Sequence, residues 1–296
     1  MPNTSNGSSI YIDCIYSVNF RDLAALPDLL NPGDLANLVN QLKCKPMGAL
    51  EDMRLPLEPE GWYHIYNRGN EGRTIFFSPD QYRYFLTKYA AYMSPYWDTY
   101  AYCLLPNHFH LAVQIQSVDT ILEHAPNDLK NVNRQFLKEL SQRFPEIGIP
   151  PSDADLLNFK NLVNLFAAHE HGRYQLAVYA VRERFRHFLL GYAKAVNQQQ
   201  NRTGSLFQKL FRRRRVESEA YLATLIGYIH RNPLHHGLSS DWMTYPWSSY
   251  RSLLSEHATR LKRDKILEWF GGKALFEQTH LEYTENWKSI ERFLIE

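Results

Sequence analysis

The alternation of apolar and polar residues predicts an antiparallel sheet in the first half of the chain. Residues 62–70, Trp-Tyr-His-Ile-Tyr-Asn-Arg-Gly-Asn, read as a first strand that runs into an Asn-Arg-Gly-Asn turn, where Gly69 is free to take a positive φ. Apolar residues at 100–105 and 111–115 flank a Pro-Asn pair, which predicts two further strands joined by a tight turn.

Helical periodicity predicts one helix between the first strand and the other two, and further helices after them. Ser78 is predicted to cap a helix, with Pro79 in its first turn and Gln81 completing a capping box. Another predicted helix is capped by Ser218 and is expected to stop at Pro233. The apolar face of the first helix consists of Tyr82, Phe85, Leu86, Tyr89 and Met93. A further predicted helix between the two has the apolar residues Phe185, Phe188, Leu189 and Tyr192. The apolar face of the helix after Ser218 consists of Leu222, Leu225, Ile226 and Ile229. The order strand, helix, strand, strand predicts an α+β domain with helices on one face of an antiparallel sheet.

A pair of histidines follows the Pro-Asn turn. Successive side chains of a strand point to opposite faces, so His108 and His110 are expected on one face and Phe109 on the other. Two imidazoles do not hold a metal, so a third ligand must come from elsewhere in the chain. Ala112 stands where a His-x-His-x-His protein would have its third histidine, which argues against that class.

A second His-x-His pair, His169 and His171, has a different setting. It follows a helical run and precedes Gly172, which we expect to cap the C-terminus of that helix. Residues two apart on a helix diverge by about 200°. We therefore predict that this pair lies at the surface and does not share a metal.

The predicted helix that ends at Pro233 can supply the missing chemistry. Tyr228 and Asn232 are four residues apart, so they lie on one helix face. The amide oxygen of Asn232 can bind a hard divalent cation, and two imidazoles with oxygen ligands suit Mn²⁺ or Mg²⁺. A phenol beside such a metal can attack phosphorus. A half-buried tyrosine near a helix end is, however, more often structural.

Charge is distributed unevenly along the chain. The formal net charge is only +2, yet residues 182–215 carry ten bases against one acid. Residues 201–216 read as a basic loop interleaved with aromatics, which can bind phosphates and stack on unpaired bases. The candidate DNA-binding residues are Arg68, Arg202, Lys209, Arg212, Arg213, Arg214 and Arg215.

Composition excludes several classes of protein. The three cysteines are widely spaced and form no Cys-x-x-Cys motif, which fits a reducing cytosol and argues against a disulfide framework or structural zinc. No apolar run approaches a membrane span, and the N-terminus lacks the features of a secretory signal. We therefore expect a cytoplasmic protein without a membrane partner.

Seven short motifs, taken in order, carry a family resemblance. They are Tyr-His-Ile-Tyr-Asn-Arg-Gly-Asn from 63, Ile-Phe-Phe from 75, Leu-Pro-Asn-His-Phe-His-Leu from 105, Gly-Ser-Leu-Phe-Gln from 204, Glu-Ala-Tyr-Leu from 219, Tyr-Ile-His-Arg-Asn-Pro from 228, and Tyr-Pro-Trp-Ser-Ser-Tyr from 245. Together they resemble the HUH single-tyrosine transposases, and most closely the REP-associated tyrosine transposases. The resemblance covers about residues 61–115 and 180–253.

The resemblance implies a ferredoxin-like (RRM-like) sheet and a divalent metal, Mg²⁺ or Mn²⁺. It implies that single-stranded DNA is cut next to a hairpin, leaving a 5′-phosphotyrosine and a free 3′-OH. Carried over position by position, His108 and His110 are metal ligands, Tyr228 is the nucleophile and Asn232 is the third ligand. Members of the family vary the residue type at the position of Asn232. Tyr221, seven residues earlier, is the alternative nucleophile.

The rest of the chain departs from the family pattern. We expect an acidic N-terminal extension over residues 1–58, a transposase domain over 59–253 with a helical insertion at about 116–180, and a C-terminal helical appendage over 254–296. Two other functions are left open: a catalytically silent protein that binds a DNA or RNA hairpin, and a metal-dependent phosphohydrolase of small nucleotides. Whether the chain forms a homodimer is also left open.

Overall fold

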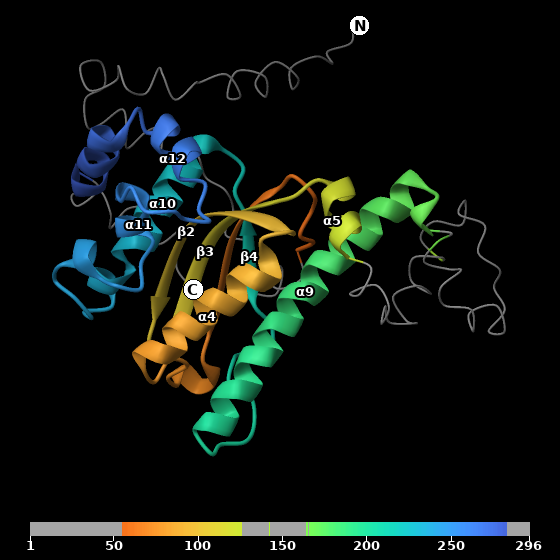
Figure 1. Ribbon diagram of the computed structural model, residues 1–296, viewed down its shortest axis with the longest axis horizontal. Helices are drawn as coiled ribbons and strands as arrows, with labels where there is room; N and C mark the ends of the chain where they lie inside the picture. The colour runs from red at the N-terminus through yellow and green to blue at the C-terminus, as the bar shows by residue number, and fades with distance from the viewer. Residues whose placement is uncertain (1–54, 126–141, 143–163, 165, 283–296) are drawn as a thin grey trace, which may run out of the picture. The chain divides into compact units, whose positions relative to one another are not determined.

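The structure is a computed structural model that describes residues 55–125, 142, 164 and 166–282 (Figure 1). The expectations for residues 1–54, for 126–141, 143–163 and 165 of the expected insertion, and for 283–296 of the expected appendage lie outside the described residues. Described residues up to Arg263 belong to one compact unit, and those from Asp264 onward belong to another. Within the described part of the chain, no helix is long and apolar enough to cross a membrane.

A four-stranded antiparallel sheet forms the centre of the first unit, with strand order β2-β3-β1-β4. The strands are β1 (Trp62–Arg68), β2 (Trp97–Leu105), β3 (His108–Ile115) and β4 (Arg212–Arg215). The first strand and the hairpin around the Pro-Asn turn are confirmed. The expectation of a loop at residues 212–215 is wrong, because these arginines pair with Tyr63–Tyr66 and extend the sheet by an edge strand.

Two long helices cover one face of this sheet. They are α4 (Pro79–Met93) and α9 (Glu170–Gln199), which lie side by side in Figure 1. Phe109 points to this face, where its ring lies 5.3 Å from Phe85 of α4 and 6.3 Å from Phe185 of α9. The predicted apolar stripes of both helices are therefore core. The α+β fold class is confirmed by this arrangement.

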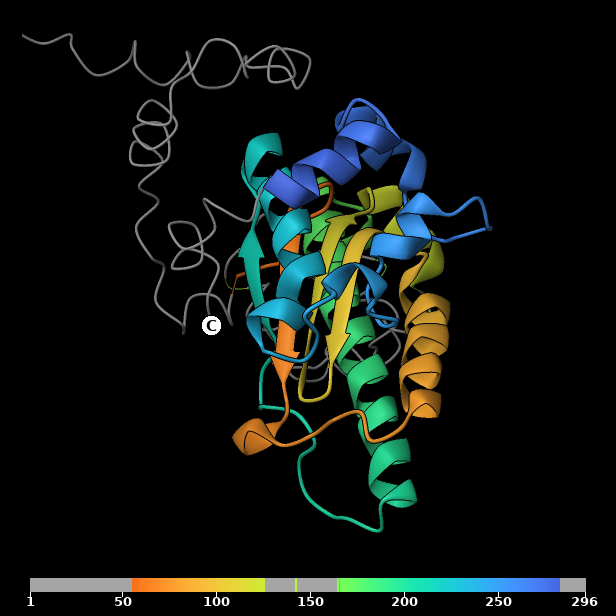
Figure 2. The same ribbon diagram turned by 90° about the vertical axis from the view of Figure 1, so that its left-hand side faces the viewer.

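A third helix, α10 (Glu219–His235), covers the opposite face and packs on β2 and β3 (Figure 2). Helices therefore lie on both faces of the sheet, and not on one face as expected. Ser218 caps it by accepting a hydrogen bond from the Tyr221 amide at 3.2 Å. The expected stop at Pro233 is wrong. Proline removes the hydrogen bond of its own amide, but His236 N–H still bonds to the Asn232 carbonyl, so the helix continues to His235.

Other local predictions fail for reasons of backbone geometry. Gly69 has a φ of −59°, and glycine is needed there because a Cβ would lie 1.9 Å from the Arg73 carbonyl oxygen. A short 3-10 helix, η2 (Asn70–Gly72), follows it. Ser78 makes no capping bond; instead Gln81 Oε1 accepts from the Phe77 amide at 2.7 Å.

Gly172 does not end a helix. It lies in the first turn of α9, where a Cβ would lie 2.1 Å from the Phe166 carbonyl oxygen, so the expected C-cap is wrong and the glycine allows a close backbone contact. His169 is instead the residue before α9, and both His169 and His171 are exposed. The prediction that this pair lies at the surface is confirmed.

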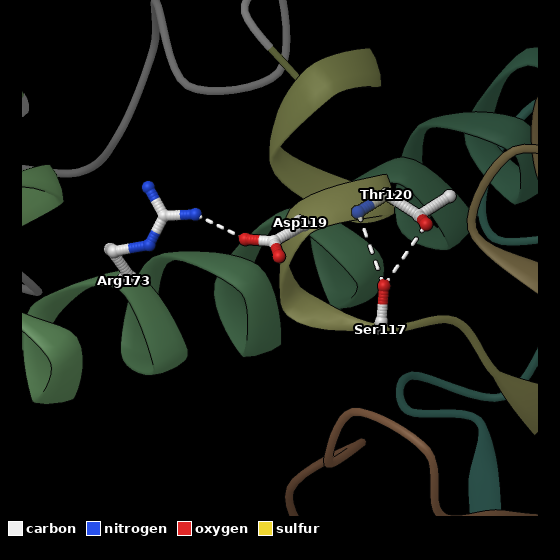
Figure 3. A network of polar contacts seen from close by, with 4 residues as sticks. All are labelled: Ser117, Asp119, Thr120 and Arg173. Carbon is white, nitrogen blue, oxygen red and sulfur yellow. Dashed lines mark hydrogen bonds and ion pairs between the residues drawn. The ribbon is translucent and has the colours of Figure 1, made fainter.

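Polar contacts join the start of α9 to α5 (Val118–His124), as Figure 3 shows. The Ser117 hydroxyl accepts a hydrogen bond from the Thr120 amide at 3.3 Å and so caps α5. The Arg173 guanidinium of α9 forms an ion pair with Asp119 of α5. Described parts of the expected 116–180 insertion thus pack within the core, to which Ile121 also contributes.

The remaining elements follow α10. The short helix η5 (Trp242–Thr244) packs on α10, and α11 (Tyr250–Leu254) comes next. Residues 254–263 belong with the first unit, since the Lys262 Nζ lies 3.0 Å from Asp98 Oδ1. The helix α12 (Arg263–Trp269) starts at the boundary between the units.

Candidate active site

Rings from β1, β3 and α10 form a buried cluster on the α10 face of the sheet. The ring of His110 lies 5.1 Å from His108, 5.2 Å from His64 and 5.4 Å from Tyr228. Strand alternation brings the two β3 histidines to this face, and the β1–β3 pairing places His64 beside them. The exposed fractions of His108, His110 and Tyr228 are 2%, 0% and 4%. Their positions are therefore set by packing.

The protonation of His108 is defined by its neighbour. Its Nδ1 lies 2.6 Å from Asn107 Oδ1. The Asn107 amide is itself oriented, because its Nδ2 donates to the Gly72 carbonyl at 3.1 Å. Since Asn107 presents an acceptor, Nδ1 of His108 carries the proton and donates it. The lone pair of His108 is then on Nε2, which is buried and has no hydrogen-bond partner among the described residues.

His110 is held in a similar way by a second imidazole. Its Nδ1 lies 2.9 Å from Nε2 of His64, and this contact is buried. When the proton is on Nδ1, His110 donates to His64 and keeps a lone pair on its own Nε2. Histidines that bind metals are commonly oriented by such a bond at the other ring nitrogen. Both β3 histidines are therefore anchored through Nδ1.

Asn232 and Tyr228 reach the cluster from one face of α10. The Asn232 Nδ2 donates to the Tyr228 carbonyl at 2.9 Å. This bond leaves Oδ1 of Asn232 buried and without a hydrogen-bond partner among the described residues. The Asn232 side chain is nevertheless close enough to His108 to favour its protonated form, with an effect on the pKa smaller than that of burial.

Burial keeps the three imidazoles neutral. It lowers the pKa of His64 and of His108 to about 3, helped by Arg214 for His64 and by His236 and Arg68 for His108. Burial also lowers the pKa of His110 well below its ordinary value, with further contributions from His108 and His64. Neutral imidazole is the form that binds a metal ion.

The donor set fits a hard divalent cation. Nε2 of His108 and Oδ1 of Asn232 are both acceptors, so they cannot bond to each other, and leaving each unsatisfied costs about 1–3 kcal/mol. A cation would satisfy both. Within the described ranges, no three His, Cys, Asp or Glu side chains are arranged to hold a metal. The candidate ligands are His108, His110 and Asn232, and this set contains an amide in place of a third residue of those four types.

The candidate DNA-binding residues lie in three different parts of the structure. Arg68 lies at the end of β1 on the site face, near enough to His108 to lower its pKa. Arg202 and Lys209 lie in the segment between α9 and β4, where Arg202 is half-buried and Lys209 is exposed. The four arginines of β4 are divided between the two faces of the sheet, as described below.

Sequence reasoning missed three residues of this site. The sequence pattern predicts only a turn at Asn107 and only a strand at His64. His236, whose ring lies 4.4 Å from that of His108, was missed because the helix was expected to stop at Pro233. Its spacing of four residues from Asn232 was the signal that could have revealed it.

Comparison with known proteins adds little to this geometry. No protein-family model matches the chain, and no curated protein matches it. Among solved structures, the chain is similar to one described as "Structure of the REP associates tyrosine transposase bound to a REP hairpin". The identity is 12%, the alignment covers 69% of this chain and 84% of the other, and the TM-score is 0.37. This likeness is too weak to support an argument about function.

Proposed function

We propose that this protein is a metal-dependent endonuclease and strand transferase that cuts single-stranded DNA next to a hairpin through a covalent tyrosine intermediate. The observation that carries the proposal is the position of Tyr228. Its ring packs 5.4 Å from that of His110, and one helical turn away Asn232 presents a buried acceptor beside His108. The order of sequence motifs, which resembles the tyrosine transposases, points the same way.

The residues have separate roles in the proposed reaction. His108, His110 and Asn232 would hold the metal, while Asn107 and His64 orient the two imidazoles. A bound Mg²⁺ or Mn²⁺ would polarise the phosphoryl oxygens and offset the charge that develops on them. The family resemblance, rather than the geometry, supplies DNA as the substrate.

The covalent step is carried by Tyr228. Its phenolic oxygen forms a bond to phosphorus, and the bond from phosphorus to the 3′ oxygen of the preceding nucleotide breaks. The phenol loses its proton and the departing 3′ oxygen gains one, so the products are a 5′-phosphotyrosine and a free 3′-OH. Attack by a 3′-OH on the phosphotyrosine reverses these changes and joins strands.

The decisive experiment looks for the covalent adduct. Labelled hairpin-bearing oligonucleotides taken from the DNA that flanks the gene are incubated with the protein and Mn²⁺, then separated under denaturing conditions. The wild-type protein should form a labelled band that resists denaturation. Tyr228→Phe should abolish this band while DNA binding, measured by gel shift, is retained.

The matched control is Tyr221→Phe, which removes a hydroxyl from the first turn of the same helix. It should form the adduct at the wild-type level. An undiminished adduct in Tyr228→Phe would refute the assignment of the nucleophile. A wild-type protein that binds the hairpin but never forms an adduct would instead be a silent hairpin-binding protein.

A further inference from the structure

Strand geometry divides the four consecutive arginines of β4 into two pairs. In the β1–β4 ladder, Arg214 pairs with His64 and Arg212 with Tyr66. Paired residues of neighbouring strands project to the same face of a sheet, and alternate residues of one strand project to opposite faces. Arg212 and Arg214 therefore lie on the face that carries the histidine cluster.

Arg212 and Arg214 are each half-buried, so part of each side chain is exposed on this face. The helix α10 packs over β2 and β3, so these arginines lie beside it on the same face.

The other two arginines serve the opposite face. Arg213 is 5% exposed, and its guanidinium lies 4.9 Å from the centroid of the Phe211 ring. Burial and the nearby Arg182 of α9 lower its pKa to about 10. Arg215 forms an ion pair with Glu58, which also raises the pKa of Arg215. Both side chains thus have structural partners on the α9 side of the sheet.

The register also gives the distance from the arginines to the reaction centre. Arg212, Tyr66 and His110 lie in one line across β4, β1 and β3. Neighbouring strands are about 4.8 Å apart, so the backbone of Arg212 lies about 10 Å from that of His110. A side chain as long as arginine bridges much of this gap. Phosphates near the one that is cut are therefore within its range.

We infer that the substrate strand crosses the sheet from the β4 edge toward Tyr228, and that Arg212 and Arg214 bind the phosphates adjacent to the cut. This inference rests on the proposed function, since it takes single-stranded DNA as the ligand. It assigns the phosphate contacts of the arginine run to alternate residues and excludes Arg213 and Arg215 from them.

Salt dependence of DNA binding tests the assignment. The dissociation constant of an uncleaved hairpin-bearing oligonucleotide is measured over a range of salt for the wild type, the double variant Arg212→Gln/Arg214→Gln, and Arg215→Gln. Each lost contact to a single strand lowers the slope of log K against log salt by about 0.7. The double variant should thus lose about 1.4 from the slope and bind about tenfold or more weakly at fixed salt.

Arg215→Gln is the comparison on the other face, because it removes one positive charge from the same strand. Its slope should equal that of the wild type. A wild-type slope in the double variant, or a loss of about 0.7 in Arg215→Gln, would overturn the inference. In the wild-type protein, methylphosphonate groups placed one at a time should weaken binding most at the one or two phosphates next to the cut. A uniform effect would also overturn it.

These outcomes are distinct from failure of the proposed function. If the wild-type protein forms the covalent adduct but the two arginines make no difference, only the inferred path of the strand is wrong. If the wild-type protein neither binds nor cuts any of the oligonucleotides, the proposed function fails, and the path of the strand fails with it.

Discussion

Replacement of His64 by phenylalanine tests whether the β1 imidazole prepares the metal site. His64 contacts His110 through one hydrogen bond of 2.9 Å, and the two rings are stacked at 5.2 Å. Phenylalanine keeps a planar ring of similar size, so the stacking should persist. What is lost is the partner of the His110 Nδ1, and with it the group that orients this imidazole.

The size of the effect can be worked out from this contact. Removing a partner that orients a metal-binding histidine typically weakens metal binding by about 10- to 100-fold. This range corresponds to about 1.4–2.7 kcal/mol of binding free energy. The free energy of unfolding should fall by about 1–3 kcal/mol, because Nδ1 of His110 is left buried without an acceptor.

Titration with Mn²⁺, followed by the electron paramagnetic resonance signal of free Mn²⁺, measures the affinity without any need for DNA or activity. His230→Phe is the matched control. His230 is also fully buried, and its Nε2 lies 2.8 Å from the Ser249 hydroxyl, but this bond lies outside the ring cluster. His230→Phe should lower stability and leave the Mn²⁺ affinity unchanged.

Two results would refute this reasoning. One is a folded His64→Phe protein that binds Mn²⁺ as tightly as the wild type does. The other is an equal loss of affinity in His230→Phe, which would show that general loosening of the fold, rather than orientation of His110, weakens the site.

Three further predictions concern α9 and are checked by thermal or urea denaturation. Gly172→Ala should destabilise the protein by about 1–3 kcal/mol, because the added Cβ would lie 2.1 Å from the Phe166 carbonyl oxygen; an unchanged midpoint would show that the backbone can yield there. Gly191→Ala in the same helix should stabilise it by up to about 1 kcal/mol, because nothing lies within 4 Å of the new Cβ and alanine favours helix; a loss of stability would contradict this. Tyr192→Phe should cost about 1–2 kcal/mol, because the buried hydroxyl donates to the Ile75 carbonyl at 2.9 Å, and no cost would mean that water replaces it.

Local patterns in the sequence were sufficient for much of the fold. The turn at Pro106 and the alternation on either side of it determine that His108 and His110 share a face, because side-chain direction on a strand depends only on position along it. The spacing of Tyr228 and Asn232 determines that they share a helix face in the same way. These are properties of neighbouring residues, so a single sequence contains them.

Tertiary structure alone decided how these faces meet. The pairing of β1 with β3 puts His64 against His110, and the pairing of β1 with β4 turns Arg212 and Arg214 toward the histidines. A shift of one residue in either register would reverse the face of every side chain on the shifted strand. Register depends on contacts between residues far apart in the chain, which periodicity does not record. The sequence therefore determined the candidate ligands and nucleophile, while long-range packing decided their neighbours and which of the arginines face them.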